Sequence, residues 1–136
     1  MKLIRIVFTL LCLLGLYSCA DYSVKNNQKK EKQYYSSSGF ALIYDENLFI
    51  QKIINKKMNN DEIKVMHNFL KPNTRVKIIN PSNSKIVETK IYKKANFPEI
   101  FSIVVSAKIA ETLDLDKENP FVEIIEIKKN KTFVAK

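Results

Sequence analysis

The chain has no tryptophan, two glycines and four prolines among its 136 residues. So few glycines and prolines exclude collagen-like chains and Gly/Pro-rich low-complexity chains. Two cysteines exclude a disulfide-dense scaffold and a four-cysteine metal site, and a single histidine excludes a histidine-only metal centre. We therefore expect neither a metal nor a cofactor.

What the chain does contain is a globular composition with an excess of lysine. Hydrophobic residues make up 46% and charged residues 27%, which is typical of one folded domain. The net charge is +9, and the only arginines are Arg5 and Arg75. Because readers of nucleic acid usually use arginine for bidentate contacts, we expect no nucleic-acid partner. An anionic surface remains a suitable neighbour.

The start of the chain predicts export. Residues 1–5 carry two positive charges, and residues 6–16 form an apolar run of eleven residues. That run is too short for a mature membrane span, which needs about 20 residues. A basic start, a short apolar run and a small residue before the cut are typical of a signal peptide, here residues 1–18.

The cut site is more specific, because residues 16–19, LYSC, resemble the lipobox of bacterial lipoproteins. The resemblance implies that Cys19 is lipidated and anchors the protein to a membrane. Ala20 follows the cysteine, and the absence of Asp there favours the outer membrane, facing the periplasm. The alternative is an ordinary signal peptide that happens to contain a cysteine.

The mature chain divides by composition into a linker, a domain and a tail. Residues 19–38 are polar and rich in lysine, without an apolar period, which predicts a flexible linker. Residues 39–127 form the domain, and residues 128–136 form a basic tail. The lysines of the linker either rest on anionic lipid headgroups or are simply solvated.

Short alternating segments indicate that the domain is mainly β. A polar turn at residues 80–84 separates two of these segments and predicts a hairpin. One helix is expected over residues 106–115, with Ser106 as its cap and Ile109, Ala110 and Leu113 on one face. Such a chain favours a small closed β-barrel, since closure removes exposed edges. The expected strands are residues 40–44, 74–79, 85–91, 102–105 and 121–127.

Several segments resemble the rare lipoprotein A (RlpA) family. Residues 67–76, HNFLKPNTRV, are similar to the family's HKTLPFGTRV, and Asn80 and Asn83 follow at the family's spacing. Residues 105–116, VSAKIAETLDLD, are similar to LSRAAAEALGLD, and residues 121–124 fit the closing strand. The resemblance covers residues 39–127.

The resemblance implies a six-stranded double-psi β-barrel with one or two short helices. Many members of the family are periplasmic lipoproteins that cleave peptidoglycan as lytic transglycosylases. The expected partners are therefore peptidoglycan glycan strands, the membrane through Cys19, and division-site proteins.

Four positions depart from the family's pattern of acidic residues. The family's Glu and Asp upstream of the histidine fall on Lys56 and Asn59, and its Asp after the hairpin falls on Lys93. A further Asp falls on Val104. Only His67 remains of the polar set.

These replacements bear directly on bond cleavage. Cleaving a glycosidic bond needs a proton donor with a raised pKa, usually a carboxyl group. A lysine cation repels the developing positive charge on the sugar. We therefore expect a protein that binds glycan and has lost, or nearly lost, transglycosylase activity.

Two other functions remain open. One is an active transglycosylase that uses Asp61 or Glu62 together with His67. The other is an envelope adaptor that keeps the barrel as an interaction scaffold.

The candidate residues also have plain structural interpretations. Asp61 and Glu62 are alternatively surface carboxylates, and His67 is alternatively a buried, hydrogen-bonded residue. For ligand binding the candidates are Tyr92, Lys93 and Lys94, whose lysines would meet carboxylates of the cell wall or form a solvated pair.

Overall fold

The computed structural model describes residues 1–7 and 34–127, in two compact units, Met1–Glu31 and Lys32–Lys136. In the first unit, residues 2–7 are helical. Among the described residues, no helix is both long and apolar enough to cross a membrane. The predictions for Cys19, the basic tail, and most of the signal peptide and linker concern residues outside the described ranges.

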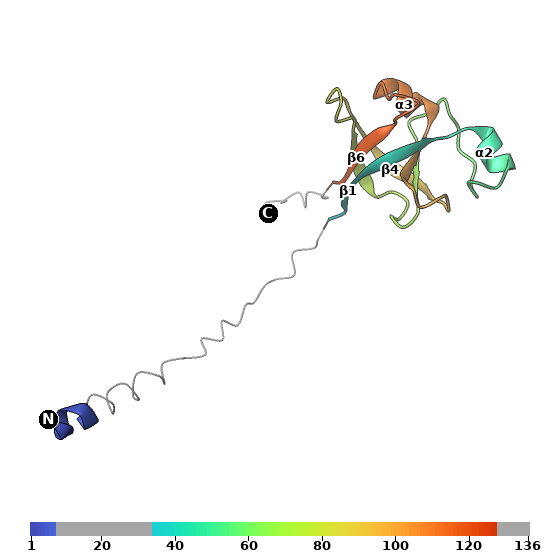
Figure 1. Cartoon of the computed structure of the whole chain (residues 1–136). Coiled ribbons are helices and arrows are strands. Elements are labelled where there is room, and N and C mark those ends of the chain that lie inside the picture. Colours follow the sequence, from blue (N-terminus) through green and yellow to red (C-terminus); the bar gives the residue numbers. More distant parts are fainter. Residues whose placement is uncertain (8–33, 128–136) are drawn as a thin grey trace, which may run out of the picture. The chain divides into compact units, whose positions relative to one another are not determined.

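The second unit is a closed barrel of six strands in the order β1-β5-β2-β4-β3-β6 (Figure 1). This confirms the prediction of a mainly β, six-stranded barrel. Helices α2 (Glu46–Ile50) and α3 (Ala107–Thr112) lie in the connections. The strands are β1 (Ser36–Ile43), β2 (Val65–His67), β3 (Arg75–Ile79), β4 (Ile86–Lys94), β5 (Phe101–Val105) and β6 (Phe121–Glu126).

The strand order has an internal two-fold relation. Exchanging β1, β2 and β3 with β4, β5 and β6 reproduces the same set of neighbours. The two parallel pairs, β1 with β5 and β2 with β4, exchange with each other, while all other pairs are antiparallel. Two interlocked halves of this kind form the double-psi arrangement.

Alternation of side chains explains the β3–β4 hairpin. In β3, Val76 and Ile78 are fully buried, whereas Arg75 is exposed and Lys77 half-buried between them. Strands β3 and β4 pair along their length, beginning with Ile79 opposite Ile86 beside the predicted polar turn. The predicted hairpin is therefore confirmed.

The barrel strands bury side chains on both faces. Val65 on β2 and Val105 on β5 belong to the core inside the barrel, while their neighbours Met66 and Val104 belong to a second buried cluster. Successive side chains of a strand point to opposite faces, so the second cluster lies outside the barrel wall. Leu48 and Phe49 of α2 pack against it. Its buried members are Tyr44, Ile54, Met58, Met66, Ala95, Phe97 and Val104.

Some boundaries differ from the prediction. Strand β1 begins at Ser36 rather than Phe40, because its serines pair by backbone with β6, which composition does not reveal. Strand β2 and helix α2 were not predicted, since segments of three and five residues are too short for a period to show. Helix α3 is capped by Ser106, whose hydroxyl accepts from the amide of Ile109, as predicted.

Buried Asn80 joins the hairpin turn to the end of α3. Its Nδ2 donates to the carbonyl oxygens of Leu113 (3.0 Å) and Asp114 (3.2 Å), and its Oδ1 accepts from the amide of Ser82 (3.0 Å). Asn83 adds a further bond to Leu113 (3.0 Å). The two asparagines that support the family resemblance thus have structural roles.

We expect Asn80→Ala to lower the free energy of unfolding by about 1–3 kcal/mol, because it removes three hydrogen bonds of a buried side chain that join the turn to the end of α3. Ser82→Ala, at an exposed position of the same turn, should change it by less than about 0.5 kcal/mol. Urea denaturation of both variants checks this. Equal unfolding midpoints for the two variants would contradict the assignment.

Candidate functional site

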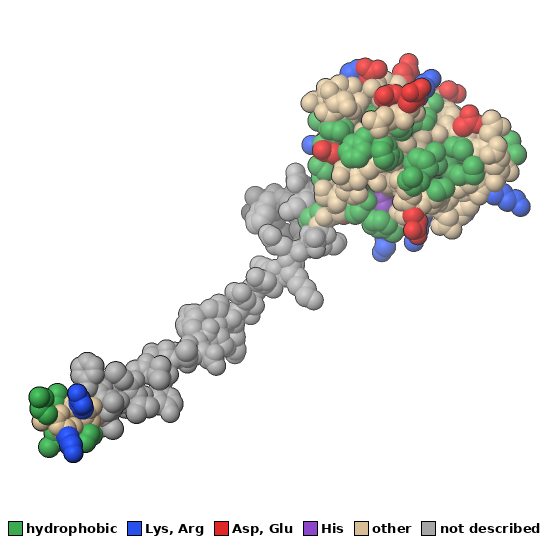
Figure 2. Space-filling model, viewed as in Figure 1, with side chains coloured by type: hydrophobic (Ala, Val, Ile, Leu, Met, Phe, Trp, Pro, Cys, Tyr) green, Lys and Arg blue, Asp and Glu red, His purple; other side chains and the backbone are tan. Residues whose placement is uncertain are grey.

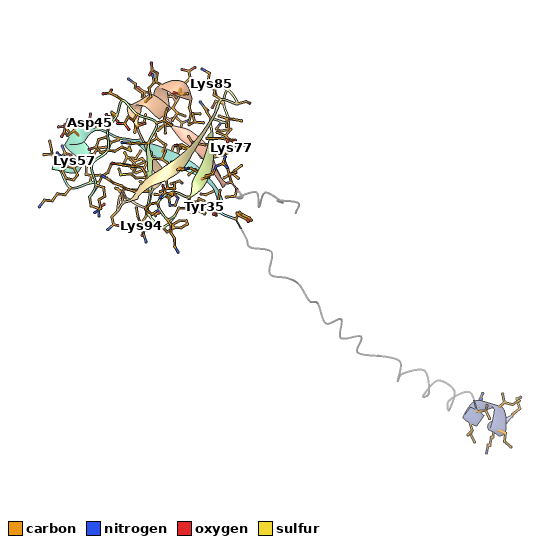
Figure 3. The ribbon with its side chains drawn as sticks, turned by 180° about the vertical axis from the view of Figure 1, so that it is seen from behind. Tyr35, Asp45, Lys57, Lys77, Lys85 and Lys94 are labelled. Atoms are coloured by element: carbon orange, nitrogen blue, oxygen red, sulfur yellow. The ribbon has the colours of Figure 1, made fainter. Side chains whose placement is uncertain are left out.

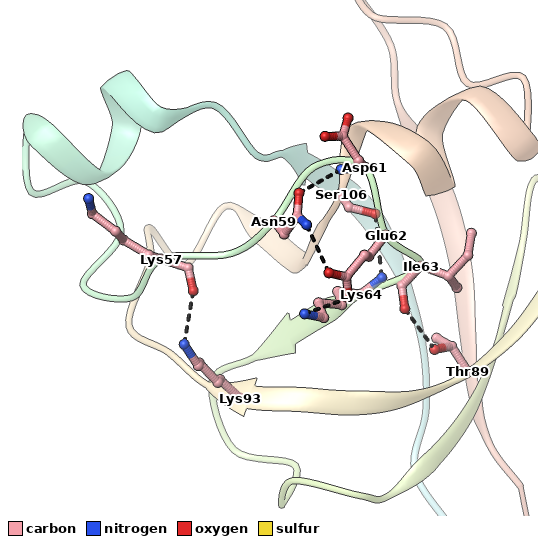
Figure 4. Close-up of polar contacts among 9 residues, drawn as sticks. All are labelled: Lys57, Asn59, Asp61, Glu62, Ile63, Lys64, Thr89, Lys93 and Ser106. Atoms are coloured by element: carbon pink, nitrogen blue, oxygen red, sulfur yellow. Dashed lines mark hydrogen bonds and ion pairs between the residues drawn. The ribbon is translucent and has the colours of Figure 1, made fainter.

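The loop between α2 and β2 is held on β4 at two points. The Nζ of Lys93 donates to the carbonyl oxygen of Lys57 (3.1 Å), and Thr89 Oγ1 donates to the carbonyl oxygen of Ile63 (3.5 Å) (Figure 4). Between these two points the loop is joined to the start of α3, because the amide of Ala107 donates to Asn60 Oδ1 (2.9 Å). The loop therefore has a defined position above β4.

Two ammonium groups lie over the ring of Tyr92, on β4. Lys64 Nζ is 4.3 Å and Lys93 Nζ 4.6 Å from the ring centroid, which are cation–π distances. Tyr92 remains 37% exposed. Lys57 lies beside them through its bond with Lys93, and we call Lys57, Lys64, Tyr92 and Lys93 the lysine–tyrosine surface.

Glu62 neutralises one of these lysines. Its carboxylate lies 2.7 Å from Lys64 Nζ and accepts from Asn59 Nδ2 at 2.8 Å. The hydrogen bond from Lys64, followed by the bond from Asn59, holds the pKa of Glu62 below its ordinary value, and the pKa of Lys64 is raised by the same contact. A carboxyl group with a lowered pKa is ionised at neutral pH and is a poor proton donor.

Lys93 has no such neutralising partner. Among the described residues its ammonium makes no ion pair, and its contacts are the Lys57 carbonyl and the Tyr92 ring. Lys57 itself is paired with Glu46 at 3.3 Å and lies over the ring of Phe49. The half-buried Lys93 is therefore a positioned positive charge.

His67 lies at the end of β2 and is fully buried. Its Nδ1 accepts from the amides of Phe69 and Leu70, both at 3.2 Å, and its Nε2 lies 3.3 Å from Tyr35 Oη. The rings of Tyr35 and Phe69 meet the imidazole edge to face, with centroids 5.1 and 4.5 Å away.

These bonds determine the protonation of His67. Because Nδ1 accepts two N–H groups, it carries no proton, and the neutral ring has its proton on Nε2, directed at Tyr35. Burial lowers the pKa of His67 from 6.5 to about 4. The ring is neutral at physiological pH and fastens the chain entering β1 to the end of β2.

Asp61 lies in an open cavity of about 940 Å³ beside α3. The cavity is lined by apolar side chains such as Leu115 and by the acidic residues Glu111 and Asp114 as well as Asp61. Among the described residues the carboxylate of Asp61 makes no hydrogen bond or ion pair. Figure 2 shows acidic side chains gathered at the end of the barrel where α3 lies.

The structure brings together some candidates and separates others. Tyr92 and Lys93 share one surface, and Lys94 is exposed at the end of the same strand, in register with His67 across the β2–β4 pair. Asp61 and Glu62 precede β2, whereas His67 ends it, so neither carboxylate joins the histidine in one site.

Sequence reasoning missed Lys57, Lys64 and Tyr35. One lysine gives little signal in a chain that has 21 of them. Tyr35 is an aromatic residue in the polar run assigned to the linker, and that was the available signal. Of the positions aligned with the family's acids, Lys56 and Asn59 are exposed on the loop.

In residues 1–7 and 34–127, no three histidine, cysteine or acidic side chains form a group that could hold a metal ion. No protein-family model matches the chain, and no curated protein sequence matches it.

The low pKa of His67 predicts a pH-dependent stability. The unfolded chain takes up a proton near pH 6.5 and the folded chain only near pH 4, so stability is lost as the pH falls through this window. From pH 7 to pH 4 the contribution lost is about 3 kcal/mol. Urea denaturation across this range should show a smaller loss in His67→Gln.

Because His67 is the only histidine of the chain, the difference between the two proteins isolates it from the carboxyl groups. Parallel stability curves for wild type and His67→Gln between pH 7 and pH 4 would contradict the assignment.

Proposed function

We propose that this protein binds peptidoglycan glycan strands through the lysine–tyrosine surface and does not cleave them. The observation that carries the proposal is the uncompensated ammonium of Lys93, at the position where the family resemblance calls for an aspartate. A fixed cation there attracts an anionic polymer and opposes the positive charge that develops when a glycosidic bond breaks.

The state of the other candidates supports the absence of cleavage. A glycosidase-type acid needs a raised pKa, but the pKa of Glu62 is lowered by Lys64. His67 is neutral and buried, with both ring nitrogens engaged. Asp61 lines the cavity beside α3, whereas Tyr92 and Lys93 do not.

The charge distribution supports binding to the cell wall. Peptidoglycan carries carboxylates on its muramic acid residues and stem peptides, and the ammonium of Lys93 offers them a positive charge that has no ion-pair partner among the described residues. Tyr92 offers an exposed ring next to this ammonium, and Lys94 is exposed at the end of the same strand. Sugar rings and carboxylates therefore find complementary groups on one face.

The proposal includes the cellular setting. Export and lipidation at Cys19 would anchor the protein in the cell envelope, on the outer membrane facing the periplasm. Glycan strands and division-site proteins would then lie within its reach. The support is the signal-like start of the sequence and its resemblance to a lipobox.

Sedimentation with insoluble peptidoglycan tests binding. The full chain in mild detergent should pellet with sacculi, and Lys93→Gln should reduce the bound fraction about threefold or more, since it removes one unpaired charge at the surface. Lys85→Gln is the matched control, because Lys85 lies at the opposite end of β4 from Lys94 (Figure 3) and pairs with Asp114. If the wild type stays in the supernatant, an adaptor function replaces glycan binding.

Product analysis tests the absence of cleavage. Incubation with glycan strands freed of peptides should release no 1,6-anhydromuramyl ends, while an active lytic transglycosylase releases them in a parallel reaction. Release by this protein would refute the proposal. Loss of that release in Asp61→Asn or Glu62→Gln would then identify the proton donor.

Labelling with an alkyne fatty acid tests the anchor. We expect the label on the wild type and on Cys12→Ser, whose cysteine lies in the predicted signal peptide, and its loss in Cys19→Ser. Equal labelling of wild type and Cys19→Ser would rule out lipidation at this residue.

A further inference from the structure

We infer that the lysine–tyrosine surface recognises the carboxylate group of peptidoglycan rather than its neutral sugar hydroxyls. The inference rests on the proposed function and names the chemical group that the surface binds. In glycan freed of peptides this group is the lactyl carboxylate of muramic acid. In intact peptidoglycan the lactyl group is amidated, and the carboxylates of the stem peptides take its place.

The bonding of Lys93 favours a carboxylate ligand. A lysine ammonium has three N–H donors, and the Lys57 carbonyl accepts one of them at 3.1 Å. Two donors remain for a ligand, and the side chain is already held by Lys57 and by the Tyr92 ring. Because the charge is fixed before binding, a carboxylate meets it with little loss of side-chain entropy.

The neighbouring charges leave Lys93 as the open position. Lys64 is occupied by Glu62 at 2.7 Å, and Lys57 by Glu46 at 3.3 Å. The pair at Lys64 shows that a carboxylate is already bound by an ammonium that lies over the Tyr92 ring. Lys57 meets Lys93 only through its backbone carbonyl, so it brings no carboxylate to Lys93 (Figure 4).

The ring of Tyr92 supplies the second half of the recognition. It is 37% exposed and lies 4.6 Å from Lys93 Nζ. A group that carries a carboxylate next to aliphatic carbon, as the lactyl ether and the stem-peptide residues do, can place its charge on the ammonium and its carbon against the ring.

The large cavity beside α3 does not suit the same ligand. Four carboxylates, those of Asp45, Asp61, Glu111 and Asp114, line it against two lysines, Lys108 and Lys117, and like charges repel a carboxylate. Lys108 is already paired with Glu111 at 2.9 Å. An anionic group is therefore directed to the lysine–tyrosine surface.

Competition with two matched sugars tests the inference. N-acetylmuramic acid and N-acetylglucosamine differ by the lactyl ether that carries the charge. The full chain is first bound to sacculi in mild detergent. The concentration of N-acetylmuramic acid that releases it should be lower than that of N-acetylglucosamine by a factor of about three or more, as expected for one exposed ion pair. The difference should persist in Lys85→Gln and vanish in Lys93→Gln.

Unchanged thermal unfolding of Lys93→Gln shows that its loss of discrimination is not a loss of folding. Equal release of the wild type by the two sugars overturns the inference and leaves the proposed glycan binding intact. A wild type that never pellets overturns both the inference and the proposed function.

Comparison of sacculi with strands freed of peptides identifies the source of the carboxylate. Tighter binding to the freed strands indicates the lactyl group, and tighter binding to sacculi indicates the stem peptides.

Discussion

A lysine ammonium without a counter-charge governs the chemistry of the surface above β4. Lys93 is held by the carbonyl of Lys57 and the ring of Tyr92, and its two lysine neighbours are each neutralised by a glutamate. The arrangement keeps a positive charge at the position where the resembling family has an aspartate. In the function that we propose, attraction of anions and inability to protonate a leaving oxygen have this one cause.

Burial gives the histidine a different role from the one that its position in the resembling segment implies. His67 accepts two backbone amides at one nitrogen and faces Tyr35 with the other, so it closes the end of the barrel where β1 enters. Asp61 and Glu62, the carboxylates nearest to it in sequence, precede β2. The three-residue strand β2 thus separates Asp61 and Glu62 from His67, which the sequence offered as partners in one site.

The sequence predicted the elements whose exposure alternates, and missed those held by long-range contacts. Val76 and Ile78 show the period of β3 because one of its faces is polar, whereas β2 is buried throughout and has no period to detect. Tyr92 and Lys93 were identified from the family resemblance. Lys64 was not, because its place over Tyr92 follows from how the loop after α2 folds back on β4. Spacing along the chain does not contain that information.

Nuclear magnetic resonance with a glycan tetrasaccharide that contains muramic acid tests this account most directly. Isotope-filtered contacts between the labelled protein and the sugar report both where the ligand lies and whether it stays intact. We expect contacts from the lactyl group to Tyr92 and Lys93, with an unchanged tetrasaccharide after prolonged incubation. Contacts to Asp61 and the cavity beside α3, or a shortened sugar with an anhydromuramyl end, would contradict it.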